Sequence, residues 1–310
     1  MHHSEKKGNL LLLLSALIWG CAFVAQSVGM DHVGPFTFQC ARSLLGSAVL
    51  IPVFLTLDHR KKRAGTYVKP TKEEKKALVK AGILCGVIMT VAANLQQIGI
   101  QYTTAGKAGF ITAMYILIVP ILGLFLGRKV PLRLWLCVII AALGLYLLSV
   151  PEGFTGINKG DVYIFLCAIV FAVHIMVIDH YVDRVDGVRL SFLQFLVCGI
   201  LSAVLMFALE DPSWEGILGA GTSIAYAGIL SCGIAYTLQI VGQKYTNPTM
   251  ASLILSLESV FAVLGGIVML REIPTVREAL GCLLMFSAII IPQLPERKVH
   301  EEAEEPITIA

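Results

Sequence analysis

Ten apolar segments, each long enough to cross a lipid bilayer, account for nearly all of this 310-residue chain. A membrane-spanning helix needs about 20 apolar residues, or about 30 Å of length. Inside lipid the backbone must hydrogen-bond to itself, and a single segment achieves this as an α-helix. The sequence therefore predicts an all-α integral membrane protein with ten transmembrane helices. The segments cover residues 9–29, 36–57, 78–101, 105–126, 132–150, 161–182, 189–209, 221–243, 249–270 and 275–293.

The composition agrees with this fold class and leaves no room for a soluble catalytic domain. Hydrophobic residues make up 56% of the chain and charged residues 15%, with a mean hydropathy of +0.79. Soluble domains carry about 25% charged residues. The net charge of +3 comes from the loops and does not indicate a nucleic-acid partner. The eight cysteines lie inside the apolar segments without CxxC or His-paired spacing, so we predict no disulfide, metal site or cofactor.

The two halves of the chain share a spaced pattern, which indicates an internal duplication. The pattern LQxxGxxYT occurs at residues 95–103 and again 143 residues later, at 238–246. At the same offset, RKVP at 128–131 aligns with REIP at 271–274. The first helices open with KGN at 7–9 and KGD at 159–161, and Gln39 of the second helix matches Gln194 of the seventh.

Because each half contains an odd number of crossings, the two halves must lie in opposite orientations in the membrane. The expected fold is therefore two inverted five-helix repeats, the usual plan of a secondary transporter. We expect the first repeat over residues 1–150 and the second over 159–295. Residues 296–310 are acidic and are expected to form a disordered cytoplasmic tail.

The distribution of lysine and arginine predicts the orientation. With the N-terminus in the cytoplasm, nineteen of these residues lie inside and four outside, and Arg42 falls within the second helix. Positive residues favour the cytoplasmic side. We therefore expect a multi-pass protein of the cell membrane with both termini in the cytoplasm.

Glu258 is the first candidate for contact with a transported molecule. It lies ten residues after Pro248, which places it about 15 Å along the ninth helix, near the middle of the bilayer. A charged carboxylate there costs about 2.5–3.5 kcal/mol on insertion scales, so Glu258 is either a proton-binding or amine-binding group or a neutral acid bonded to a neighbouring helix. Tyr115 occupies the equivalent position in the fourth helix and is expected across the cavity from Glu258.

Arg42 lies about a third of the way into the second helix, and its counterpart in the other repeat is Val197. Its guanidinium group keeps its charge at physiological pH and needs a partner or water. Three interpretations are open: recognition of an anion, snorkelling toward the outer surface, or pairing with a carbonyl at a helix end.

Other polar and aromatic side chains complete the predicted cavity. Polar residues deep in a bilayer normally face a cavity or a partner; here they either line a permeation route or bond one helix to another. Trp19 is a candidate aromatic wall or a lipid-facing residue, and His174 a titratable group or a structural hydrogen-bonder. The remaining candidates are Asn94, Gln96, Tyr236 and Gln239.

Glycine pairs and one proline mark places where helices approach or bend. The pairs Gly82/Gly86 and Gly123/Gly127 have the GxxxG spacing that permits close helix contacts. Pro120 removes one backbone donor and permits a kink in the fourth helix.

Several of these motifs together resemble the drug/metabolite transporter superfamily, in particular its EamA-like family. They are Trp19-Gly20, Arg42, the stretch SLESVFA at 256–262 and Arg271-Glu272, and the likeness extends over nearly the entire chain. The resemblance implies a ten-helix carrier, and many members export amino acids or other small metabolites from bacteria.

The leading hypothesis is a secondary transporter, not an enzyme, that exports a small polar or amphipathic metabolite by alternating access. Its partners are the substrate and the lipid bilayer, a proton is the candidate coupling ion, and a homodimer is left open. A membrane scaffold or sensor subunit is the first alternative. An intramembrane lipid-modifying enzyme is the second, but the sequence shows no nucleophile–base pair or metal cluster at depth.

Overall fold

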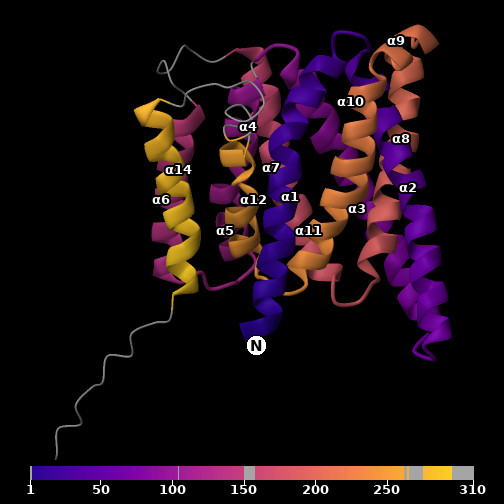
Figure 1. Cartoon of the computed structure of the whole chain (residues 1–310), viewed down its shortest axis with the longest axis horizontal. Helices are drawn as coiled ribbons and strands as arrows, with labels where there is room; N and C mark the ends of the chain where they lie inside the picture. The colour runs from indigo at the N-terminus through magenta and orange to yellow at the C-terminus, as the bar shows by residue number, and fades with distance from the viewer. Residues whose placement is uncertain (1, 104, 150–157, 262–263, 265–274, 295–310) are drawn as a thin grey trace, which may run out of the picture.

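The computed structural model describes residues 2–103, 105–149, 158–261, 264 and 275–294, and these form a bundle of helices without a strand. The helices run along one common direction (Figure 1). Their bounds are α1 His2–Gly29, α2 Pro35–Arg63, α3 Lys72–Ile100, α4 Ala105–Ala113, α5 Tyr115–Phe125, α6 Leu132–Ser149, α7 Lys159–Tyr181, α8 Gly187–Leu209, α9 Trp214–Gly219, α10 Gly221–Ala225, a π-helix Tyr226–Ala235, α11 Tyr236–Gln243, α12 Pro248–Leu255, α14 Val276–Ile290 and a 3₁₀ turn Ile291–Gln293.

The helices have the lengths and composition of membrane spans. Seven continuous helical stretches are long and apolar enough to cross a bilayer, and two shorter apolar helices accompany them, Leu132–Leu147 and Pro248–Phe261. Large apolar side chains such as Val204, Phe207 and Leu283 lie exposed on the outside of the bundle, as expected where lipid is the solvent. The predicted class, an all-α multi-pass membrane protein, is confirmed.

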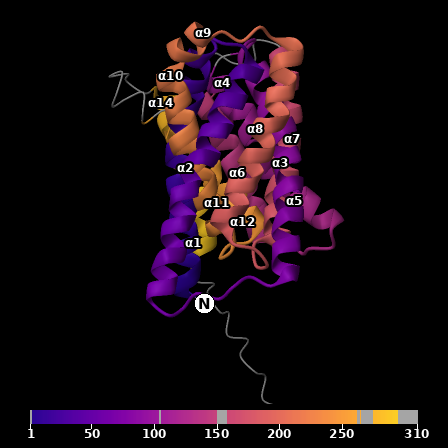
Figure 2. The same cartoon turned by 90° about the vertical axis from the view of Figure 1, so that its right-hand side faces the viewer.

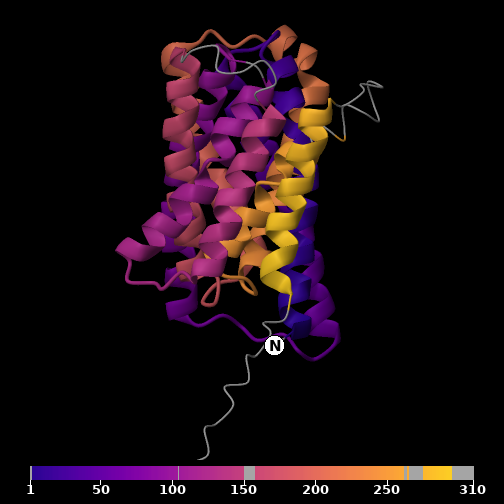
Figure 3. The ribbon, with the colours of Figure 1, turned by 90° about the vertical axis from the view of Figure 1, so that its left-hand side faces the viewer.

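Both ends of the described chain lie at the same end of the bundle. α1 begins there and α14 ends there, beside α6 on one side of the molecule (Figures 1 and 3). Along the opposite side α2 packs against α8, which also contacts α3 (Figure 2).

Polar residues at the ends of the apolar segments set where the helices begin. Thr71 and Glu74 form a capping box at the start of α3, and Asn158 and Asp161 form one at the start of α7. Each box supplies acceptors for backbone N–H groups that the first turn leaves unpaired. The N-terminus of α2 is capped from a distance, since the Glu210 carboxylate accepts the backbone N–H groups of Phe36 and Thr37 at 2.9 and 2.8 Å.

Two of the predicted continuous helices are broken, and the breaks lie at equivalent positions of the two halves. The segment 105–126 is interrupted at Met114, and the segment 249–270 at Ser256-Leu257. At the second break the hydroxyl of Ser256 donates to the carbonyl oxygen of Leu253 at 2.8 Å, a bond that competes with the helical ladder. Pro120 lies inside α5, six residues after the first interruption, and the bend expected at Pro120 stays a prediction.

The predicted helix 221–243 contains a ten-residue π-helix, Tyr226–Ala235. π-Helical turns are rare and occur mostly at functional sites. The hydroxyl of Tyr226 donates to the carbonyl oxygen of Ile18 in α1 at 2.8 Å. This irregular stretch leads directly into α11.

In the described structure, one of the two GxxxG pairs brings helices together and the other does not. A Cβ atom on Gly82 or Gly86 would lie 2.5 Å from the Cβ atom of Leu193 or Val197 in α8, so α3 and α8 touch through these glycines as predicted. Among the described residues, a Cβ atom on Gly123 would have Arg128 as its neighbour, 3.9 Å away, and no atom lies within 4 Å of one on Gly127, whose positive φ of 73° ends the helix. A helix contact at Gly123/Gly127 is therefore not found within the part of the chain that the structure describes.

Some predictions concern residues outside the described part of the chain. These are the REIP motif at 271–274, the far end of the segment 249–270, and the tail at 296–310.

Candidate functional site

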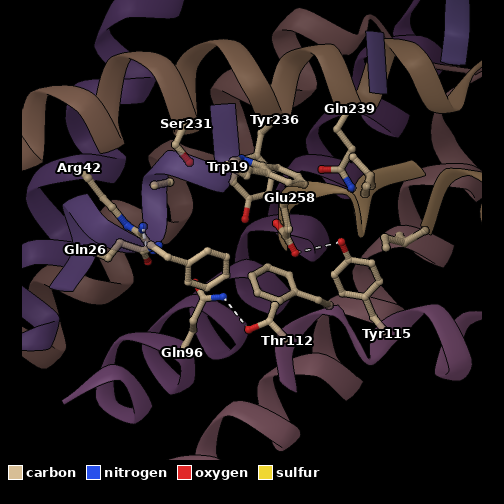
Figure 4. Close-up of a pocket in the computed structure, with 15 residues that line it drawn as sticks. Trp19, Gln26, Arg42, Gln96, Thr112, Tyr115, Ser231, Tyr236, Gln239 and Glu258 are labelled. Atoms are coloured by element: carbon tan, nitrogen blue, oxygen red, sulfur yellow. Dashed lines mark hydrogen bonds between the residues drawn. The ribbon is translucent and has the colours of Figure 1, made fainter. Parts of the chain in front are cut away.

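A small cavity lies between the helices of the two halves (Figure 4). Its water-accessible volume is about 40 Å³, which is room for about three water molecules. A molecule the size of an amino acid needs a wider space than this conformation provides. The lining consists of Trp19, Ala22, Phe23, Gln26, Arg42, Gln96, Thr112, Tyr115, Phe171, Ile175, Ser231, Tyr236, Gln239, Leu255 and Glu258.

Most of the lining is made of positions that correspond between the two halves. With the offset of 143 residues in the later helices and of 152 in the first helix of each half, ten of these residues form five pairs. The pairs are Trp19/Phe171, Phe23/Ile175, Gln96/Gln239, Thr112/Leu255 and Tyr115/Glu258. Each half therefore contributes the same five positions to one cavity.

Tyr115 and Glu258 contact each other directly. The hydroxyl of Tyr115 donates to Oε1 of Glu258 at 3.2 Å, across 143 residues of sequence. Both are buried, and each follows immediately after the interruption of its helix. Two equivalent positions can touch only close to an axis that relates the halves.

Arg42 is held at one end of the lining by two glutamines. Its Nε donates to Oε1 of Gln39 at 2.6 Å and its Nη1 to Oε1 of Gln26 at 2.8 Å. The side chain is only 5% exposed. Figure 4 shows Arg42 and Gln26 at one end of the site and Tyr115 at the other. Of the three interpretations of Arg42, snorkelling and pairing with a helix-end carbonyl do not describe this arrangement.

Aromatic rings fill the space between these ends. The ring centroids of Trp19 and Tyr236 are 4.5 Å apart with their planes tilted by 56°. Phe195 packs edge-on against the other side of Tyr236 at 5.1 Å. Trp19 is buried, so it faces the interior and not lipid.

The two ends of the bundle carry matching contacts between the halves. At the end where α1 begins, the Oγ1 of Thr246 donates to the Oδ1 of Asn9 at 2.9 Å, and the ammonium of Lys7 lies 5.7 Å from the centroid of the Tyr245 ring. A Cβ atom on Gly8 would lie 2.9 Å from the carbonyl oxygen of Gly242. These contacts join α1 to the end of α11.

The opposite end repeats this arrangement with the roles of the halves exchanged. Thr103 donates to Oδ1 of Asp161 at 3.0 Å, and the ammonium of Lys159 lies 3.6 Å from the Tyr102 centroid. A Cβ atom on Gly160 would lie 2.7 Å from the carbonyl oxygen of Gly99. One difference is added charge, since Asp161 also pairs with Lys107 at 2.6 Å.

Comparison with known protein families shows where this chain belongs. The model of the EamA-like transporter family matches it twice, over residues 6–150 and 158–292. The chain belongs to the EamA-like transporter family.

Relatives of this EamA-like protein carry transporter names. A protein of Archaeoglobus fulgidus named as an uncharacterized transporter is 30% identical over 92% of this chain and 85% of its own length. The uncharacterized transporter YoaV of Bacillus subtilis is 23% identical over 92% of this chain and 96% of its own length. A solved crystal structure matches with a TM-score of 0.75 and 19% identity, covering 93% of this chain and 96% of the other. At that identity the likeness shows the fold alone.

The structure brings together seven of the nine predicted site residues of this EamA-like chain. Those seven line the cavity: Trp19, Arg42, Gln96, Tyr115, Tyr236, Gln239 and Glu258. Their contact with a substrate stays a prediction.

Asn94 and His174 lie outside the lining. The side-chain amide of Asn94 donates to the carbonyl oxygen of Thr90 and to the hydroxyl of Ser202, at 2.8 and 3.0 Å. Nε2 of His174 lies 3.0 Å from Oε1 of Gln194. Both side chains join neighbouring helices within the EamA-like fold, the alternative role considered for such residues.

Sequence reasoning missed several lining residues. Gln26 and Ser231 are polar residues within apolar segments, and Ser231 lies in the π-helix, which no sequence pattern indicates. Thr112 was missed although it accepts a hydrogen bond from Nε2 of Gln96 at 3.2 Å. Phe171 carried a usable signal, because the repeat offset pairs it with Trp19.

Proposed function

We propose that this chain is a secondary transporter that carries a small metabolite, an amino acid or a compound of similar size and polarity, by alternating access. The observation that carries the proposal is the Tyr115–Glu258 contact inside a cavity lined by five pairs of equivalent positions. Transporters with inverted repeats bind their substrates at the interface of the repeats, near the middle of the membrane.

The matching contacts at the two ends of the bundle support inversion of the repeats. Asn9 with Thr246 and Asp161 with Thr103 are equivalent pairs, yet they lie at opposite ends of the molecule. A two-fold axis in the membrane plane, passing near Tyr115 and Glu258, exchanges them. In such a fold, opening one end while the other stays closed gives alternating access without an additional domain.

The interrupted helices support a cavity in the middle of the membrane. Broken helices are tolerated at membrane depth where their free backbone groups line a cavity or lie inside protein. Met114 and Ser256-Leu257 are such points, one in each half.

For direction and placement we propose an exporter in a bacterial cytoplasmic membrane with both termini in the cytoplasm. The excess of lysine and arginine supports this orientation. α1 begins and α14 ends at the same end of the bundle, as an even number of crossings requires (Figure 3). Glu258 is the proposed proton-binding group, because it is the buried carboxyl group of the cavity lining.

Proteoliposomes loaded with a ¹⁴C-labelled mixture of amino acids test this proposal. We expect the wild-type protein to release label faster than protein-free liposomes, and faster still when the exterior is acidic. In the Glu258→Gln variant the acceleration by external acid should disappear, whereas Tyr146→Phe on α6, outside the cavity lining, should behave as wild type.

The possible outcomes separate the parts of the proposal. Release equal to that of protein-free liposomes would contradict transport of this class of compound and favour the scaffold or sensor alternative. An unchanged response to acid in Glu258→Gln would remove the proton coupling and leave transport standing.

A further inference from the structure

We infer that Arg42 binds a carboxylate group of the transported molecule, an assignment that rests on the proposed transport function. The inference begins with the asymmetry of the cavity. Five lining residues have no equivalent in the lining from the other half: Ala22, Gln26, Arg42, Ser231 and Tyr236. The cavity therefore extends beyond its symmetric part toward Arg42 (Figure 4).

The charge of Arg42 has no counter-charge in the part of the chain that the structure describes. Its hydrogen bonds go to Gln26 and Gln39, whose amide oxygens are neutral. Glu258, the carboxyl group of the same cavity, bonds to Tyr115 instead. The centroid of the Phe38 ring lies 5.6 Å from the Cζ of Arg42, and this ring carries no charge.

A buried guanidinium in this state favours an anion. It stays charged at any physiological pH, and buried charges in proteins are normally paired with a charge of opposite sign as well as hydrogen-bonded. The two glutamines hold Nε and Nη1 and thereby fix the plane of the group. Within the described residues Nη2 donates no hydrogen bond, and a carboxylate oxygen is the acceptor that its geometry suits.

A second unpaired donor lies in the same lining. The indole N–H of Trp19 is buried and has no hydrogen-bond acceptor within the described structure. Buried indole N–H groups usually find a partner. Trp19 lines the cavity between Arg42 and Tyr115 in the view of Figure 4. A carboxylate held at Arg42 offers acceptor atoms on that side of the cavity.

The opposite end of the cavity has the complementary chemistry. Glu258 and Tyr115 present a carboxyl and a hydroxyl group, and the buried side-chain oxygen of Gln239 accepts no hydrogen bond from the residues that the structure describes. These groups accept hydrogen bonds. The substrate class that fits both ends is a small molecule with a carboxylate at one end and a hydrogen-bond donor, such as an ammonium, at the other.

Thermal unfolding of the purified full-length chain in dodecyl maltoside tests the assignment with two probes of nearly equal shape. Isovalerate carries the carboxylate and isovaleramide replaces it with a neutral amide. At constant ionic strength we expect isovalerate, but not isovaleramide, to raise the unfolding midpoint in a saturable way. Arg42→Gln should raise the half-saturating concentration of isovalerate at least tenfold. For Arg42→Lys this concentration should lie between those of the wild type and Arg42→Gln, because lysine keeps the charge but lacks the planar guanidinium group.

A second measurement covers the case in which Arg42→Gln does not fold. The chain has three tryptophans, so Trp135→Phe with Trp214→Phe leaves Trp19 as the reporter. Its fluorescence should respond to isovalerate and not to isovaleramide. Three results would overturn the assignment. They are equal responses to isovalerate and isovaleramide, an unchanged half-saturating concentration of isovalerate in Arg42→Gln, and a response to inorganic phosphate alone.

The flux assay separates this inference from the proposed function. If Arg42→Gln releases the labelled amino acids with wild-type KM, the assignment of Arg42 fails and transport stands. If the wild-type protein binds isovalerate through Arg42 but moves no label, the proposed transport of amino acids fails.

Discussion

The contact between Tyr115 and Glu258 has an energetic consequence that a double-mutant cycle can measure. Tyr115→Phe removes the donor, Glu258→Met removes the acceptor with little change in volume, and the double variant removes both. Because the O···O distance of 3.2 Å is long for a hydroxyl donor, we expect a coupling energy near the average for pairs inside membranes, about 0.6 kcal/mol. An ionised Glu258 would raise it to about 1.5–3 kcal/mol.

Equilibrium unfolding in mixtures of dodecyl maltoside and sodium dodecyl sulfate, followed by circular dichroism, gives the four free energies of the cycle. Tyr146→Phe serves as the control, since Tyr146 lies on α6 outside the cavity lining and should combine additively with Glu258→Met. A Tyr115–Glu258 coupling within about 0.3 kcal/mol of zero, the usual scatter for independent sites, would refute the direct contact of these equivalent residues.

Three further predictions concern the packing that surrounds the cavity. Gly86→Leu should lower unfolding stability by about 1–3 kcal/mol through overpacking, whereas Gly123→Leu, which has no close contact among the described residues, should change it less; equal effects in thermal unfolding would contradict the α3–α8 contact. Gly8→Leu should push α1 away from α11 at the end of the bundle where α1 begins, and Gly160→Leu should push α7 away from α3 at the opposite end. If both variants raised the accessibility to trypsin or to thiol reagents at the same end, the result would count against the two-fold relation. Asp161→Asn should lower the thermal midpoint by removing the charge that pairs with Lys107, and an unchanged midpoint would show that this ion pair adds no stability.

The sequence predicted the all-α membrane class because long apolar runs follow one another along the chain; in the described residues they form seven long apolar helices and two shorter ones. It also predicted which positions correspond in the two halves, and hence that Tyr115 and Glu258 belong opposite each other. These features depend on local composition and on a fixed offset, both of which are visible in a single chain.

Other features depend on three-dimensional contacts that one sequence does not contain. Apolar residues dominate α7 and α8, so an apolar stripe does not mark which face turns inward. The break at Met114 has no glycine or proline at the break itself, and the π-helix packs against α1 and α2, contacts that no local sequence pattern indicates. Arg42 was recognised as unusual, but its partner Gln26 lies in another helix at no characteristic spacing.

Distances between spin labels at the two ends of the bundle test alternating access most directly. One label pair replaces Lys7 and Tyr245, the other Lys159 and Tyr102, in a chain whose native cysteines are replaced by alanine or serine. In lipid nanodiscs we predict that only one of the two distances is long at a time. Conditions or variants that lengthen the distance between positions 7 and 245 should leave the distance between 159 and 102 short, and those that lengthen the second distance should leave the first one short. Distances that lengthen together at both ends, or that stay fixed in a protein shown to transport, would contradict a cavity that opens to one side at a time.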